Sequence, residues 1–176
     1  MSYTNTIDYN EENNKKFIEF LNKELEIGIN IKNKSEWTLF LESITTPAFS
    51  KMYNESEKNI KMQNKINNYE VSEFKGDAIV GYIAVTKIIG KDKVGKMDDE
   101  KQKLVSNERL SDIFDKLKLD RFIYTQLNSE ISPKIKADVI EALVYGIHEK
   151  SISKVTDFLR RYLSEEDILQ DSIILD

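Results

Sequence analysis

Glycine and proline are rare in this sequence, and their rarity limits the possible folds more than any other feature. Only six glycines and two prolines occur among 176 residues, so few positions favour a tight turn or interrupt a helix. Apolar residues recur at spacings of three and four, as in Phe17, Phe20, Leu21, Leu25 and Ile29. The alternation typical of strands is scarce. These patterns predict an all-α fold in one domain.

Local signals predict where individual helices begin. Asn67 followed by Glu70 has the spacing of a capping box, so a long helix is expected to start there. Proline is favoured at the first helical position, so Ser132-Pro133 should begin another. The polar stretch 54–68 is expected to be a surface connection that can be partly helical. We expect helices at residues 17–29, 37–46, 67–90, 98–105, 108–117, 133–149 and 153–163.

Composition restricts the chemistry that the chain can perform. It has no cysteine and one histidine, which excludes disulfides, thiolate catalysis and Cys/His zinc sites. Carboxylates, lysines and hydroxyls remain, and a hard cation with oxygen ligands is the natural cofactor for such a set. The net charge of −5 argues against a generic nucleic-acid binder.

We expect an intracellular protein with no membrane partner. The longest uncharged apolar stretch, Ala78–Thr86, is far shorter than the ~20 residues that cross a bilayer. The first residues are polar and acidic, unlike a secretion signal or an Arg-rich presequence.

Two pairs of acidic residues occur at helical spacing among apolar or small neighbours. Glu73 and Asp77 are four residues apart, and Asp138 and Glu141 are three apart, so each pair shares one face of a helix. Two interpretations are open. Both pairs can be solvated faces with lysine partners, a common arrangement in a chain with 31 acidic residues. Alternatively, the pairs face each other, and a divalent cation relieves their repulsion.

Four segments, taken in order, resemble one protein family. Residues 68–78 read N-Y-E-V-S-E-F-K-G-D-A and resemble the ribonuclease III signature N-E-R-L-E-F-L-G-D-A, with a residue inserted before its first glutamate. Residues 44–49, I-T-T-P-A-F, look like the family's L-T-H-P-S-Y. Residues 104–110, L-V-S-N-E-R-L, are nearly its L-V-S-N-E-x-L. Residues 133–143, P-K-I-K-A-D-V-I-E-A-L, resemble its P-K-x-L-A-D-x-x-E-A-L.

The resemblance implies the helical fold of a ribonuclease III endonuclease domain. It assigns residues 34–163 to that catalytic domain. Residues 1–33 are expected to hold an N-terminal helix packed on the same domain, and residues 164–176 form an acidic C-terminal tail. Too few residues follow the last expected helix for a double-stranded RNA-binding domain. Three interpretations are open: a minimal enzyme, an enzyme with an accessory RNA-binding protein as a further partner, or a sequence from which such a domain was removed.

The resemblance also assigns the site residues. Glu73, Asp77, Asp138 and Glu141 match the family's metal-binding catalytic carboxylates, and Mg²⁺ is the implied cofactor, with Mn²⁺ able to take its place. Glu70 matches a further acid near the active centre, although the capping box offers it a competing structural role.

The implied function is a homodimeric endoribonuclease that cleaves double-stranded RNA by metal-assisted hydrolysis, leaving 5′-phosphate and 3′-hydroxyl ends with short 3′ overhangs. Phe74 matches an aromatic residue of the dimer interface, with a core position as the alternative. Lys134 is a candidate catalytic residue that supports the scissile phosphate or an acid, and a plain ion pair with Asp138 is its alternative.

The sequence departs from the family pattern at a few positions. Lys75 and Lys136 replace apolar residues beside the acids, where they can contact phosphate or remain solvated. Thr46 replaces a common histidine, and His148, at a helix end, is expected to be structural. A catalytically silent dimerisation or RNA-scaffold protein is the competing function. Silent relatives typically lose one of the four acids, all of which are present here.

Overall fold

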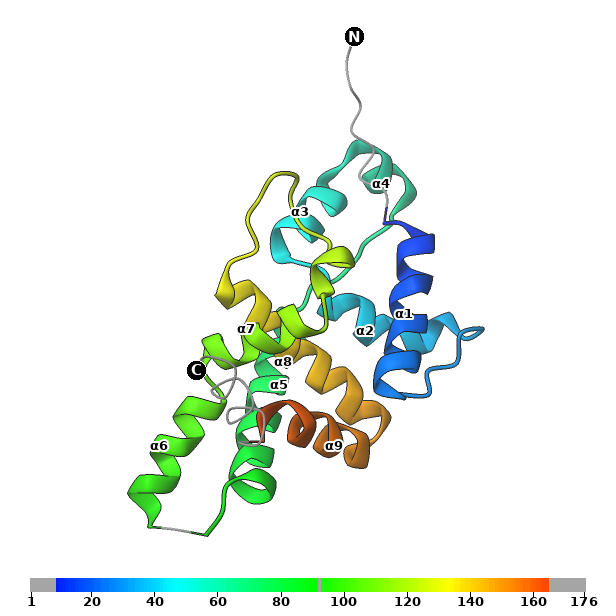
Figure 1. Ribbon diagram of the computed structural model, residues 1–176. Helices are drawn as coiled ribbons and strands as arrows, with labels where there is room; N and C mark the ends of the chain where they lie inside the picture. Colours follow the sequence, from blue (N-terminus) through cyan, green and yellow to red (C-terminus); the bar gives the residue numbers. More distant parts are fainter. Residues whose placement is uncertain (1–8, 92, 165–176) are drawn as a thin grey trace, which may run out of the picture.

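The computed structural model describes residues 9–91 and 93–164, and its regular elements are helices (Figure 1). No strand occurs in this part of the chain, which confirms the predicted all-α fold. The helices are α1 (Glu11–Leu25), α2 (Thr38–Ser43), α3 (Pro47–Glu55), α4 (Glu57–Met62), α5 (Glu70–Ile83), α6 (Val94–Leu104), α7 (Asn107–Lys116), α8 (Pro133–Lys150) and α9 (Ile152–Leu163), with short helices η1 (Lys34–Trp37), η2 (Ala84–Ile88, a π-helix) and η3 (Leu119–Arg121).

Helix α8 is the centre of the fold. It packs against α2, α5, α7 and α9, and nearly all of its side chains from Ala137 to Ile147 are buried. A helix that is apolar on all sides is stable in water only when neighbouring elements cover it. Figure 1 shows α3 and α4 at one end of the molecule and α6 at the other.

Helices α5 and α8 touch through their backbones. A Cβ atom on Gly76 would lie 1.8 Å from the carbonyl oxygen of Glu141, so only glycine fits at this crossing. This close approach brings the acidic faces of both helices together. The packing of α5 on α8 therefore depends on one residue of the sequence motif.

An irregular junction fixes the start of α5. The Tyr124 N–H donates to the Ile44 carbonyl at 2.7 Å, and the Thr46 N–H donates to the Tyr124 carbonyl at 3.0 Å. The Tyr69 N–H in turn donates to the Thr45 carbonyl at 3.1 Å. These bonds join three distant segments directly before α5 begins. The junction also gives Thr46 a role, because its hydroxyl accepts from the Phe49 N–H and caps α3.

Several predicted helix bounds differ from the observed ones. The first helix ends at Leu25 rather than Ile29, because Glu26 takes a left-handed conformation (φ 53°) and the Asn22 amide bonds both the N–H and the carbonyl of Ile29 at 2.7 Å. The polar stretch 54–68 is partly helical, since it contains α4, which Ser56 caps. Helix α6 begins at Val94, earlier than predicted.

The predicted capping box does not form. Asn68, not Asn67, accepts a hydrogen bond from the Glu70 N–H at 2.9 Å. The Asn67 side chain instead donates to Glu42 at 2.8 Å. Helix α5 passes into the π-turn of η2 instead of continuing as α-helix to residue 90.

Helix α1 contributes to the same core as the rest of the chain, for example through Phe17, whose ring centroid lies 5.3 Å from that of Phe122. The domain boundaries at 33/34 and 163/164 stay predictions. Except for Ser164, the predicted acidic tail lies outside the described residues. Within the described residues, no helix has the length and apolar character that a membrane span requires.

Candidate metal centre

Three carboxylates meet where α5 crosses α8. Glu73, Asp138 and Glu141 each offer an oxygen atom, and these atoms all lie within 4.8 Å of one another. Asp138 and Glu141 are buried, with exposed fractions of 6% and 7%, and Glu73 is half-buried. Glu73 precedes Gly76 by about one turn of α5, so the tight crossing places it against the acidic face of α8. We call this group the carboxylate cluster.

Asp77 and Glu70 lie outside this group of converging oxygens, and both are exposed. Their charges still act on the cluster. Asp77 is the strongest charge that raises the pKa of Glu141, and Glu70 contributes to the raised pKa of Glu73. The structure therefore brings three predicted acids together and leaves Asp77 near them at the solvent side.

The cluster is electrostatically unfavourable without a cation. Burial, followed by the charges of Asp77, Glu73 and Asp138, raises the pKa of Glu141 to about 8. Burial and the charge of Asp138 also raise the pKa of Glu73. Clustered carboxylate oxygens are the donors that hard divalent cations prefer, and a bound cation would offset this repulsion. The residues thus fit a divalent metal ion.

Lys134 forms the ion pair that was the alternative interpretation of this residue. Its ammonium lies 2.9 Å from both carboxylate oxygens of Asp138, four residues later on α8. The lysine side chain is 69% exposed, whereas that of Asp138 is only 9% exposed. The ammonium is consequently accessible from solvent at the edge of the cluster. Its predicted contact with a phosphate stays a prediction.

The two lysines that replace apolar family residues have partners outside the cluster. The Lys75 ammonium donates to the Tyr145 hydroxyl at 3.1 Å and lies 4.7 Å from the centre of that ring. Lys136 pairs with Asp115 at 2.8 Å. Both contacts link α8 to a neighbouring helix.

Sequence reasoning missed Tyr69. This side chain is buried, 5% exposed, and hydrogen-bonds Asp138. Burial, followed by the charge and the hydrogen bond of Asp138, raises the pKa of its hydroxyl. The only available signal was an aromatic residue at the inserted position of the motif.

The outer face of α5 is apolar and exposed. Val71, Phe74, Tyr82 and Val85 are 67%, 78%, 64% and 37% exposed, and their spacing puts them along one side of α5 and η2. We call these four residues the α5 stripe. The interpretation of Phe74 as a core residue is wrong.

The structure is that of an all-α protein in which carboxylates from two crossing helices can bind a divalent cation. In this chain, residues 70–148 match the family model of the ribonuclease III domain. This range contains the segments 104–110 and 133–143 and most of 68–78, and residues 44–49 lie outside it. Over this range the chain is similar to the ribonuclease III family.

Individual relatives agree with this assignment. Ribonuclease 3 of Pelagibacter ubique (strain HTCC1062) is 29% identical over 137 residues, 73% of this chain and 54% of the relative. Ribonuclease 3 of Mycoplasmopsis synoviae (strain 53) is 29% identical over 146 residues, 76% of this chain and 59% of the relative. The chain thus spans a little over half the length of these relatives.

Solved structures show the same fold. A nuclease domain of ribonuclease III from Campylobacter jejuni, described for flexibility in a region involved in dimer formation, superimposes with a TM-score of 0.63 at 24% identity, covering 85% of this chain and 96% of that one. A second structure of that domain gives a TM-score of 0.59 at 22% identity, covering 86% and 96%.

Proposed function

We propose that the chain is an endoribonuclease that hydrolyses double-stranded RNA with Mg²⁺ as cofactor. The carboxylate cluster carries this proposal, because Glu73, Asp138 and Glu141 converge within a ribonuclease III domain. Burial of these acids in an otherwise apolar crossing is costly for folding and is explained by a bound cation.

Glu73, Asp77, Asp138 and Glu141 would hold the metal. A bound divalent cation supplies a Lewis acid that activates water and neutralises charge on the phosphate. Glu73 and Glu141 have raised pKa values and must lose their protons to act as ligands. Asp77, exposed beside them, completes the acidic rim that faces the substrate.

Lys134 supports the scissile phosphate in this proposal. Its ammonium already neutralises Asp138, and its exposed side chain can move toward a phosphate oxygen without leaving a buried charge unpaired in the loaded site. The expected products carry 5′-phosphate and 3′-hydroxyl ends with short 3′ overhangs, as the family resemblance implies.

The enzyme acts as a homodimer in this proposal. The α5 stripe presents a contiguous apolar face that a second copy of the chain could cover, with Phe74, 78% exposed, as its most prominent side chain. Each copy would then cut one strand of the duplex.

RNA binding by this chain alone should be weak and sensitive to salt, since its net charge is −5. The shape of the A-form backbone and its 2′-hydroxyls would supply recognition. An accessory RNA-binding protein is therefore part of the proposal.

Incubation with a long RNA duplex and Mg²⁺ tests the activity. We expect the wild-type protein and a Glu149→Gln control to cleave the duplex, since Glu149 is an exposed acid on α8 outside the cluster. The Asp77→Asn/Glu141→Gln double variant should not cleave. Cleavage by both wild type and double variant, or by neither, would overturn the proposal. Binding of duplex without cleavage by the wild type would favour the silent scaffold.

A further inference from the structure

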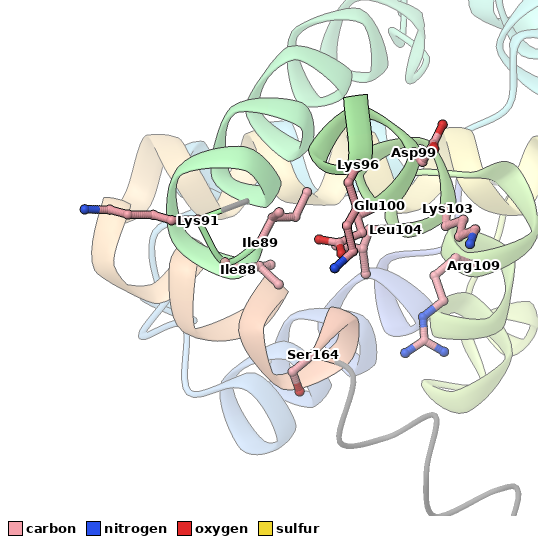
Figure 2. Close-up of a pocket in the computed structure, with 11 residues that line it drawn as sticks. Ile88, Ile89, Lys91, Lys96, Asp99, Glu100, Lys103, Leu104, Arg109 and Ser164 are labelled. Atoms are coloured by element: carbon pink, nitrogen blue, oxygen red, sulfur yellow. The ribbon is translucent and has the colours of Figure 1, made fainter. Parts of the chain in front are cut away.

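A second cavity lies far from the carboxylate cluster. It has a volume of about 640 Å³ and is bounded by α6, the end of η2, the start of α7 and the end of α9 (Figure 2). Glu73 and Ile88 are fifteen residues apart along α5 and η2, so the cavity lies roughly 20 Å from the cluster at 1.5 Å per residue. We call it the α6 pocket.

Apolar, positively charged and acidic side chains line the α6 pocket. Ile88, Ile89 and Leu104 provide apolar surface, and Lys103 and Arg109 provide positive charge. With Lys91 and Lys96, the lining holds four cationic residues against two acidic ones, Asp99 and Glu100, although the net charge of the protein is −5. Pockets that bind small organic molecules combine an apolar wall with a few polar groups in the same way, in volumes of roughly 300–1,000 Å³.

Arg109 has hydrogen-bonding capacity that the fold leaves unused. One terminal nitrogen donates to the Tyr162 carbonyl at 3.3 Å. Its Nε is buried and has no partner among the described residues. A buried N–H without an acceptor is destabilising. Because the Nε itself is buried, an anionic oxygen in the pocket would bind the terminal nitrogens of the guanidinium. Arg109 occupies the variable position of the segment L-V-S-N-E-R-L, so the family motif does not specify an arginine there.

The pocket also contains acidic groups, which a simple anion site would not need. Glu100 lies on the inner side of α6, whereas Asp99 and Lys91 point outward in Figure 2. A carboxylate accepts hydrogen bonds from hydroxyl groups. A ligand that carries an anion, a diol and a flat apolar ring would therefore use all three kinds of lining group.

We propose that the α6 pocket binds a ribonucleoside monophosphate unit, either as a free nucleotide or as an unpaired nucleotide at an RNA end. Arg109 and Lys103 bind the phosphate, Glu100 accepts from the ribose hydroxyls, and the base packs on Ile88, Ile89 and Leu104. This site goes beyond the proposed cleavage reaction. It does not require the carboxylate cluster to be active.

Binding is measured on the whole chain in EDTA, so that no metal draws phosphate to the carboxylate cluster. AMP, adenosine, inorganic phosphate and a 5′-phosphorylated single-stranded hexanucleotide are titrated by calorimetry. We expect AMP or the hexanucleotide to bind more tightly than adenosine or phosphate alone. Tighter binding of AMP would identify a free nucleotide as the ligand, and tighter binding of the hexanucleotide would identify an unpaired nucleotide at an RNA end. Backbone amide shifts should locate it at residues 88–91 and 96–109.

Variants connect the binding to the named side chains. Arg109→Gln should weaken binding about tenfold, the size expected when a charge-assisted hydrogen bond is lost. Lys103→Ala should weaken it by a smaller factor, and Lys103 is exposed, so the fold should be unaffected. Lys101→Ala is the matched control, because this α6 lysine extends toward Gly81 and does not line the pocket.

Several results would overturn the proposal. These are no saturable binding of AMP or hexanucleotide at millimolar concentration, equal weakening by Lys101→Ala, amide shifts centred on the carboxylate cluster, or phosphate binding as tightly as AMP. Failure here leaves RNA cleavage untouched, because cleavage is assayed separately with Mg²⁺. An inactive enzyme that still binds AMP would keep the pocket and remove the proposed nuclease.

Discussion

The two faces of α5 have similar apolar content but opposite surroundings. The inner face contains Gly76 and Val80, is buried against α8 and places Glu73 in the carboxylate cluster. The outer face carries the α5 stripe, with Phe74 78% exposed. Periodicity alone marks both faces as apolar. One face is covered within the chain, whereas the other is exposed, and this exposed face is the one that we propose a second copy covers.

The largest effect is expected when the inner face loses its close approach. Gly76→Ala would place a methyl group 1.8 Å from the Glu141 carbonyl oxygen, so α5 must move away from α8. We expect a loss of about 3 kcal/mol or more in the free energy of unfolding, at the upper end of overpacking effects. Chemical denaturation measures it.

Gly95→Ala provides the matched control for this substitution. Gly95 lies in α6, and a Cβ there would meet nothing within 4 Å. Alanine should stabilise this helix by about 0.5–1 kcal/mol. Equal effects of the two substitutions would show that the crossing is looser than the structure indicates.

The next effect concerns the acids that the inner face buries. The pKa of Glu141 is raised to about 8, above the ordinary value near 4.5, so the folded state holds this proton more tightly than the unfolded state does. The resulting stability is fully present below pH 4.5 and is lost as the pH rises through 8. In EDTA, the melting temperature should therefore fall between pH 5 and pH 8.5. The corresponding loss in the free energy of unfolding should be roughly 2 kcal/mol at most once solvent screening is allowed for.

Glu141→Gln should flatten this pH profile, because the amide does not titrate. Mg²⁺ should raise the melting temperature of the wild type more at pH 8 than at pH 5.5, since a cation competes with the proton. An unchanged slope in the variant would assign the pH dependence to other groups.

Substitution on the outer face should affect association rather than folding. Phe74→Ala removes an exposed side chain, so the stability of the monomer should change by less than about 0.5 kcal/mol. If the α5 stripe is the dimer interface, the dissociation constant should rise by about tenfold or more. Analytical ultracentrifugation over a concentration series measures it. Val94→Ala, at an exposed apolar residue of α6 outside the stripe, should leave association unchanged.

The smallest effect is expected at Tyr69, whose hydroxyl hydrogen-bonds Asp138 of the carboxylate cluster. Tyr69→Phe keeps the ring in the core and removes the hydroxyl that bonds Asp138. We expect about 1 kcal/mol of lost stability and a weaker apparent affinity for Mn²⁺, followed by calorimetry. Unchanged Mn²⁺ affinity would make Tyr69 purely a core residue.

Much of the fold was predictable because helix formation is encoded locally. The spacing of Phe17 and Leu21 predicted α1, and Ser132-Pro133 predicted the first turn of α8, where the Ser132 hydroxyl accepts from the Ile135 N–H. The wrong boundaries have tertiary causes. Ile29 has the helical spacing but is held outside α1 by the Asn22 amide, a contact that no periodicity reports.

The sequence by itself determined which residues are acidic at helical spacing and, through four motif segments, which family the chain resembles. Only the tertiary structure decided that Glu73, Asp138 and Glu141 converge while Asp77 remains exposed, because the crossing at Gly76 sets the distance between two helices. It also decided that Tyr69 reaches Asp138 and that Phe74 faces outward. A helical pattern fixes the direction of each side chain around its own axis, but the packing partner decides which direction is buried.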